Sequence, residues 1–225
     1  MALLPAGSAA YVAPYAVFLL LVELQARVAG AAPLLFVARV AVPALLLAWF
    51  WRRGAYAELR SYRADARTLL DLAAGAAIAA LWVAPYLLWP SLPRGAAFDA
   101  ELLGEGERAL TLGVRLLGFA LVTPFVEELF VRSFLLRFAD TFERGDFRSE
   151  PIGRFTLRSF VVTVLWFTFT HAPWEWWVAL PTGIAFNAWL YWRRELGACV
   201  VAHAAANASI WALVVLGPAP LWEFL

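Results

Sequence analysis

Seven long apolar runs divide this chain and restrict it to a fold that lies in a membrane. A helix rises 1.5 Å per residue, so about 20 apolar residues cross ~30 Å of hydrocarbon. Only 16% of the residues are charged and 63% are hydrophobic, whereas soluble domains are about a quarter charged. We expect an all-α, polytopic transmembrane helical bundle of about seven to eight spans, forming one integral membrane domain over residues 1–225. The runs are 9–26, 31–51, 69–89, 109–136, 157–172, 174–192 and 196–216.

Arginines in the connecting loops predict how the bundle is oriented. They gather in the connections 52–68 and 137–156 and at 193–194, whereas the 90–108 loop is mainly acidic. Because basic loops favour the cytoplasmic side, we expect a cytoplasmic N-terminus and a C-terminus on the opposite side. The formal net charge of +1 gives no reason to expect nucleic acid as a partner, so the lipid bilayer is the expected surrounding.

Three charges interrupt the fourth apolar run, in the stretch TPFVEELFVRSF. Glu128 and Arg132 are four residues apart, so a helix places them on one face, where they can pair. Such a pair could simply be a structural ion pair between helices. It does not account for Glu127, which a helix turns about 100° away from Glu128. Ionisable residues inside a span are costly and commonly mark a functional site.

Two further polar clusters contain the only histidines of the chain. His171 ends the fifth run, one helical turn after Phe167, and a lone histidine there is more often a packing or interface residue. His203 and Asn207 are four residues apart in the last run, among several alanines. Small residues let helices approach closely, so this pair could also be a polar packing patch. Cys199 lies in the same run and is expected to be a small packing residue.

The depth of these clusters in the membrane favours one shared site. Counted from the nearest arginine at the basic side, Glu127 lies ten residues in, or ~15 Å along a helix. By the same measure His171 lies about 20 Å in and His203 about 14 Å in. Three predicted spans therefore bring polar groups to a similar level. A common water-filled cavity would satisfy all of them.

The residue types in these clusters suit the hydrolysis of an acyl bond by water. A carboxylate and a histidine at one water can act as a general-base pair. A histidine and an asparagine on one helix face can donate hydrogen bonds to a developing oxyanion. A covalent nucleophile has less support, because no Ser-His-Asp set is arranged on these faces.

The order of the three motifs resembles the CAAX protease and bacteriocin-processing family of glutamic-type intramembrane proteases. The matching residues are Glu-Glu-x-x-x-Arg from Glu127 to Arg132, Phe-x-x-x-His from Phe167 to His171, and His-x-x-x-Asn from His203 to Asn207. They lie within residues 120–210. The stretch PFVEELFVRSFLLR, with PIGRF after it, also resembles the CAAX-protease-related branch found in bacterial exosortase systems.

This resemblance implies an intramembrane endopeptidase of the bacterial inner membrane that cleaves a membrane-associated peptide or protein. It implies that Glu127 and His171 activate water, that His203 and Asn207 stabilise the oxyanion, and that Glu128 and Arg132 support the site. No cofactor is expected. The two histidines and two glutamates could in principle bind zinc, but Asn207 suits an oxyanion hole and is a poor zinc ligand.

Two other functions remain open on the sequence alone. The chain could be a non-catalytic membrane scaffold or immunity-type protein that retains the polar cluster. It could also be a transporter in which Glu127 and the histidines relay protons. The complete motif set favours the peptidase over the scaffold. The lack of detectable inverted halves counts against the transporter.

Overall fold

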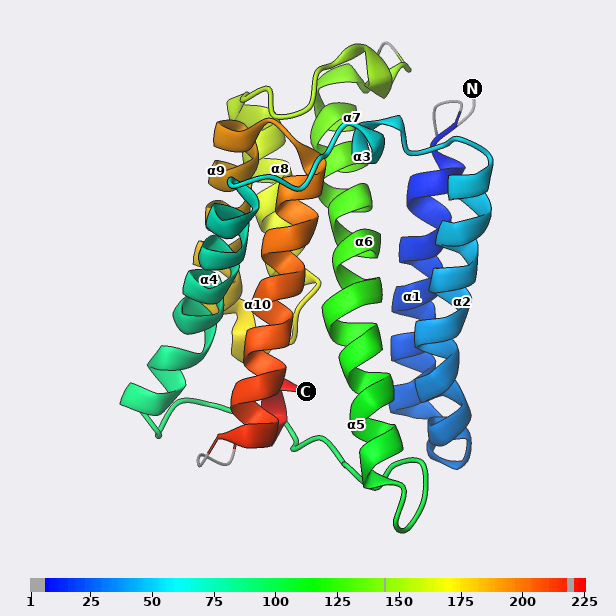
Figure 1. The fold of residues 1–225 in the computed structure, drawn as a ribbon, viewed down its shortest axis with the longest axis vertical. Coiled ribbons are helices and arrows are strands. Elements are labelled where there is room, and N and C mark those ends of the chain that lie inside the picture. The colour runs from blue at the N-terminus through cyan, green and yellow to red at the C-terminus, as the bar shows by residue number, and fades with distance from the viewer. Residues whose placement is uncertain (1–6, 144, 218–220) are drawn as a thin grey trace.

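The described part of the chain is built from helices, which confirms the predicted fold class. The computed structural model describes residues 7–143, 145–217 and 221–225, and these residues contain no β-strand. The described residues form ten α-helices, whose order is shown in Figure 1: α1 (Ala9–Arg27), α2 (Ala32–Arg52), α3 (Ala57–Arg60), α4 (Thr68–Leu88), α5 (Arg108–Leu116), α6 (Thr123–Glu127), α7 (Leu136–Thr141), α8 (Leu157–Phe169), α9 (Trp176–Arg193) and α10 (Leu196–Leu216).

The helices α5, α6 and α7, together with the segments that join them, form one continuous helical rod. Arg108–Thr141 spans 34 residues, and two π-helical segments, η2 (Leu117–Val122) and η3 (Glu128–Leu135), interrupt its α-helical hydrogen bonding. A π-helical turn contains more residues than an α-turn and is often found at functional sites. Three-residue 3₁₀ helices occupy several of the connections: η1 (Ala29–Ala31), η4 (Phe147–Ser149), η5 (Pro173–Glu175) and η6 (Trp222–Phe224).

Five of the helical segments in the described residues are long and apolar enough to cross a membrane. They are α1, η1 with α2, α4, the α5–α7 rod and α10. The predicted span at 157–172 is instead the 13-residue helix α8, which ends at Phe169. At 1.5 Å per residue it is ~20 Å long, too short for ~30 Å of hydrocarbon. The predicted span at 174–192 is α9, which is not among the five.

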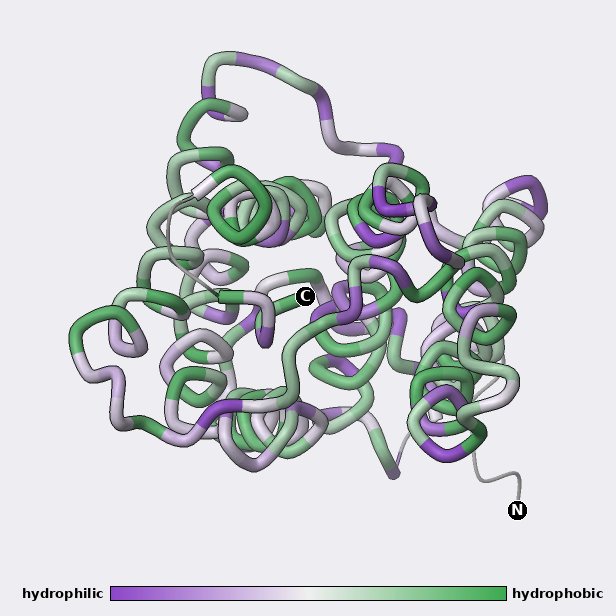
Figure 2. The backbone as a smooth tube through the Cα atoms, turned by 90° about the horizontal axis from the view of Figure 1, so that it is seen from below, coloured by the Kyte–Doolittle hydropathy of each residue, from purple (hydrophilic) through white to green (hydrophobic). Residues whose placement is uncertain are grey.

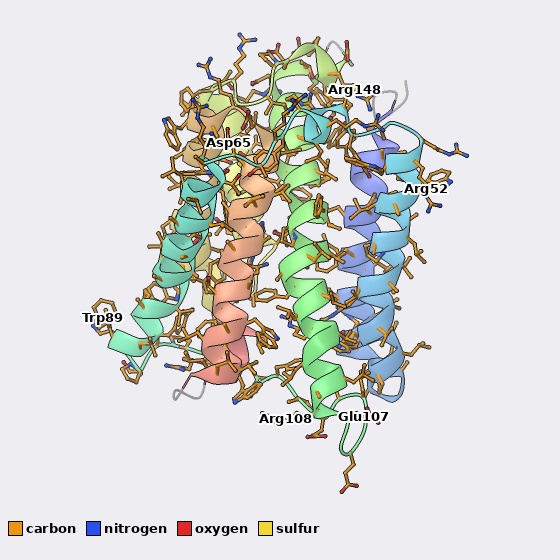
Figure 3. The ribbon with its side chains drawn as sticks, viewed as in Figure 1. Arg52, Asp65, Trp89, Glu107, Arg108 and Arg148 are labelled. Carbon is orange, nitrogen blue, oxygen red and sulfur yellow. The ribbon has the colours of Figure 1, made fainter. Side chains whose placement is uncertain are left out.

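The arginine-rich connections all lie at one end of the bundle. Arg52, Asp65 and Arg148 mark the upper end in Figure 3, and Glu107 and Arg108 mark the lower end. The first described residues lie at the upper end, and α10 runs down to the lower end (Figure 1). This arrangement agrees with the predicted alternation of basic and acidic loops.

Cysteine labelling in intact cells should show which loops share a side of the membrane. In a Cys199→Ala background, we expect single cysteines placed within 55–65 and 140–150 to react from the same side. Cysteines within 100–106 should react from the opposite side, because that loop is at the other end of the bundle. Labelling of 55–65 and 140–150 from different sides would contradict this topology.

Apolar side chains cover the outside of the bundle, as expected for a lipid-facing surface. Seen from below, the helices surround a central region that the C-terminal end of the chain enters, and hydrophobic colour dominates the tube (Figure 2). The packing of α4 on α10 is close, since a side chain at Gly75 would collide with the backbone of Ala202. Large exposed apolar residues include Leu34, Leu45, Leu69, Leu88, Leu157 and Leu216.

Candidate active site

A cavity of about 410 Å³ lies inside the bundle and brings the predicted site residues together. Volumes of this size are typical of sites that bind small molecules or peptide segments. Glu127 comes from α6, His171 from the turn after α8, and both His203 and Asn207 from α10. All four side chains line the cavity.

Glu128 is not among the residues that line the cavity, but it contacts His203, which is, and Arg132. Its Oε1 accepts a hydrogen bond of 3.2 Å from Arg132 Nη1, and both side chains are fully buried. The same oxygen lies 2.8 Å from His203 Nδ1. The pairing expected from the i, i+4 spacing is therefore present. The contact with His203, which joins η3 to α10, was not predicted from the sequence.

Arg132 is also held by aromatic rings. Its guanidinium lies 4.7 Å from the ring centroid of Phe167 on α8 and 5.3 Å from that of Phe186 on α9. Cation–π contacts of this kind stabilise a desolvated cation. The Phe of the Phe-x-x-x-His motif thus packs against the arginine of the first motif.

His171 lies two residues beyond the end of α8, and not inside a span as predicted. Its Nδ1 is 2.6 Å from the carbonyl oxygen of Phe167. A carbonyl oxygen can only accept, so Nδ1 carries the proton and the neutral ring keeps its lone pair on Nε2. The imidazole also packs between Phe167 and Trp82, with ring centroids 4.5 and 5.2 Å away. This tautomer allows Nε2 to accept a proton.

Side chains satisfy the backbone of the turn that carries His171. The carbonyl oxygen of His171 accepts a bond of 2.9 Å from Trp176 Nε1. The amide of Ala172 donates to the carboxylate of Glu175 at 3.1 Å. Tyr86 on α4 donates its hydroxyl to the carbonyl of Trp174 at 2.9 Å. Non-helical backbone at membrane depth requires partners of this kind.

The two α10 residues present donors to the cavity in different ways. Asn207 Nδ2 donates to the carbonyl oxygen of Phe119 at 2.7 Å, which leaves its second N–H free of that bond. His203 already donates through Nδ1 to Glu128. Its Nε2 can therefore donate to an oxyanion only when the ring carries a proton on both nitrogens.

Several residues that line the cavity were not predicted from the sequence to belong to the site. Tyr15 from α1 and Glu175 from η5 line the cavity, as do Arg39 from α2 and Arg115 from α5. The two arginines fall inside predicted spans, so their charge was a signal that could have identified them. Cys199 is fully buried, packs beside Leu190, and is absent from the cavity lining.

Among the described residues, no group of three or more His, Cys, Asp or Glu side chains is arranged to hold a metal ion. The Nδ1 atoms of both histidines are engaged, one by a carbonyl and one by Glu128. Zinc would therefore have to bind through the remaining Nε2 atoms. The expectation that no metal is needed stays a prediction.

One comparison with known proteins gives a match, to a family model that covers part of the chain. Residues 109–209 match the model of the family described as type II CAAX prenyl endopeptidase, Rce1-like. No curated protein and no solved structure gives a significant match to the chain. The matched range contains all seven residues of the three motifs, so the resemblance to CAAX proteases is confirmed, and the match supports a protease. The narrower resemblance to the exosortase-associated branch stays a prediction.

Proposed function

We propose that this chain, whose residues 109–209 match the model of the Rce1-like family of type II CAAX prenyl endopeptidases, is an intramembrane endopeptidase. It hydrolyses a peptide bond in a membrane-associated peptide or protein. The observation that supports this most is the meeting of Glu127, His171, His203 and Asn207 at one cavity in the bundle. Packing contacts alone would not require four polar side chains from three segments to line the same cavity.

In the proposed reaction, Glu127 and His171 together orient and deprotonate a water molecule. The water oxygen attacks the carbonyl carbon, the C=O π electrons move to the carbonyl oxygen, and Glu127 accepts the proton. His171 Nε2 can accept a hydrogen bond from the same water because Nδ1 is committed to Phe167. When the C–N bond breaks, the proton passes from Glu127 to the leaving amine.

His203 and Asn207 are assigned to the oxyanion of the tetrahedral intermediate. Asn207 offers its second amide hydrogen, and imidazolium His203 offers Nε2–H. Glu128 acts as a positioning residue because its carboxylate fixes the ring of His203 through Nδ1. Donors that are already oriented stabilise developing charge without reorganisation during the reaction.

Purified protein in nanodiscs, incubated with a panel of membrane-associated peptides, provides the direct test. We expect cleavage by the wild type and by Glu107→Ala, which changes an exposed loop glutamate. Glu127→Ala should show none, with fragments followed by mass spectrometry. A well-folded wild type that cleaves nothing in a broad panel, including prenylated peptides, would favour the non-catalytic scaffold.

The reaction as proposed needs no metal ion. We expect activity to persist after treatment with a strong chelator and exhaustive dialysis, because a carboxylate and a neutral imidazole suffice to activate water. Metal content of the active protein is measured in parallel. One zinc per chain, with activity lost on chelation and restored by zinc, would contradict this mechanism.

A further inference from the structure

Two arginines without acidic partners share the cavity with the proposed catalytic residues. Arg39 of α2 and Arg115 of α5 both line it. Neither forms a hydrogen bond or an ion pair with any residue that the structure describes. Their contacts are with aromatic rings: Arg39 lies 5.0 Å from Phe36, and Arg115 lies 4.7 Å from Phe119.

Other arginines inside the bundle are paired with acids. Arg132 pairs with Glu128 on the same rod. Arg137 pairs with Glu58, and Arg193 pairs with Asp71. An unpaired cation at membrane depth is costly unless water or an anion satisfies it. The contrast indicates that Arg39 and Arg115 are kept free for a charged ligand.

Both arginines lie at the same depth and beside each other. Each is seven residues from the lower start of its helix, or ~10 Å along the axis. Both also line one small pocket of about 10 Å³, which places their side chains next to each other. Arginines near a span end usually extend to the lipid headgroups, but these two line the interior cavity and also a small adjoining pocket beside Gly118 and Thr123.

Nearby acids neutralise the pair only in part. Glu175 also lines the cavity, but it forms no ion pair with Arg115 in the described structure. Glu223 also lines the cavity, but it is paired with Arg94. A guanidinium group presents a fork of N–H donors that matches a carboxylate, and here two such groups line one cavity.

We propose that Arg39 and Arg115 form a subsite for a carboxylate on the segment that is released from the substrate. The inference rests on the proposed peptidase function. Arg115 precedes Glu127 by twelve residues on one rod, or ~18 Å along its axis. Extended peptide covers about 3.3 Å per residue, so the carboxylate lies within about five residues of the scissile bond. The main cavity, which both arginines line, has room for the C-terminal carboxylate of a peptide.

The test compares matched peptide substrates that end in a free carboxylate or in an amide. We expect the wild type to prefer the carboxylate in kcat/KM by about tenfold or more, as charge-assisted hydrogen bonds imply. Arg39→Gln and Arg115→Gln should bring this ratio close to one, and Arg115→Lys should keep part of it. Arg108→Gln, an exposed arginine on the same helix, is the matched control and should keep the full preference.

The source of the carboxylate is tested with a third peptide pair, in which an acidic side chain within five residues of the cleavage site is replaced by its amide. If kcat/KM falls when the acidic side chain is replaced, and not when the C-terminal carboxylate is amidated, the subsite binds a side-chain carboxylate. An equal loss for carboxylate and amide peptides in the arginine variants means a structural role and overturns the proposal. A lipid phosphate is the alternative ligand. The proposal is also overturned if anionic lipid raises the melting temperature of the wild type but not of the arginine variants, while the carboxylate peptide changes neither.

Binding separates this inference from the proposed chemistry. The Glu127→Gln protein should bind the carboxylate peptide more tightly than its amide, and further substitution of Arg115 should remove the difference. If this binding preference holds while the wild type cleaves no peptide, the subsite stands and the peptidase proposal fails. Cleavage without any preference overturns the subsite alone.

Discussion

Replacing Glu127 by glutamine is expected to lower kcat by about 10²–10⁴-fold, the usual contribution of a general base. The amide keeps the size of the side chain but cannot accept the proton of the attacking water. Because Glu127 forms no ion pair in the described structure and lines a cavity, the melting temperature should change little. Single-turnover kinetics and thermal unfolding in the same nanodiscs measure both effects.

The matched control for this variant is Glu107→Gln, the same substitution at an exposed loop position. It should retain both activity and melting temperature. Near-normal turnover by Glu127→Gln would refute the role assigned to Glu127. A folded and inactive Glu128→Gln beside an active Glu127→Gln would reverse the roles of the two adjacent glutamates.

Replacing Glu128 by glutamine should affect stability as well as activity. The buried carboxylate pairs with Arg132 and holds His203. Its loss leaves the guanidinium uncompensated, and breaking a buried pair in this way costs about 3–5 kcal/mol. The expected result is a lower yield, a lower melting temperature and a strong loss of turnover.

A double variant separates the two functions of Glu128. Glu128→Gln with Arg132→Met removes both charges, and replacing a buried pair by neutral groups of similar size is often tolerated. We expect the melting temperature to recover substantially while turnover stays low, because His203 still lacks its carboxylate partner. Recovery of turnover together with stability would show that Glu128 serves only the ion pair.

Spacing rules predicted the parts of the site that lie on a single helix. The four-residue intervals placed Glu128 with Arg132 and His203 with Asn207, and depth counting placed all three clusters at one level. The bond between Glu128 and His203 joins residues 75 positions apart, so no local spacing could reveal it. The similar depth of the two clusters in the membrane allowed a contact between Glu128 and His203, but it allowed other pairings of the polar residues equally well.

The errors came from the ends of helices. Apolar composition continues through Phe169 into the turn, so a hydropathy window joined α8 to the segment that holds His171. The connection after α8 is held by tertiary partners such as Tyr86, which donates to the carbonyl of Trp174, and composition does not report such contacts. The π-helical segments were also missed, because they change the number of residues per turn without changing the apolar pattern.

The shortness of α8 has a consequence for the order in which the protein assembles. A 13-residue helix is too short to be a stable membrane insertion unit by itself. The turn after it depends on the hydroxyl of Tyr86, which belongs to the earlier helix α4. We therefore expect the hairpin of α8 and α9 to reach its final position only after α4 is in the membrane. On this view the longer spans insert first, and the proposed catalytic histidine of the hairpin is among the last groups to reach its position.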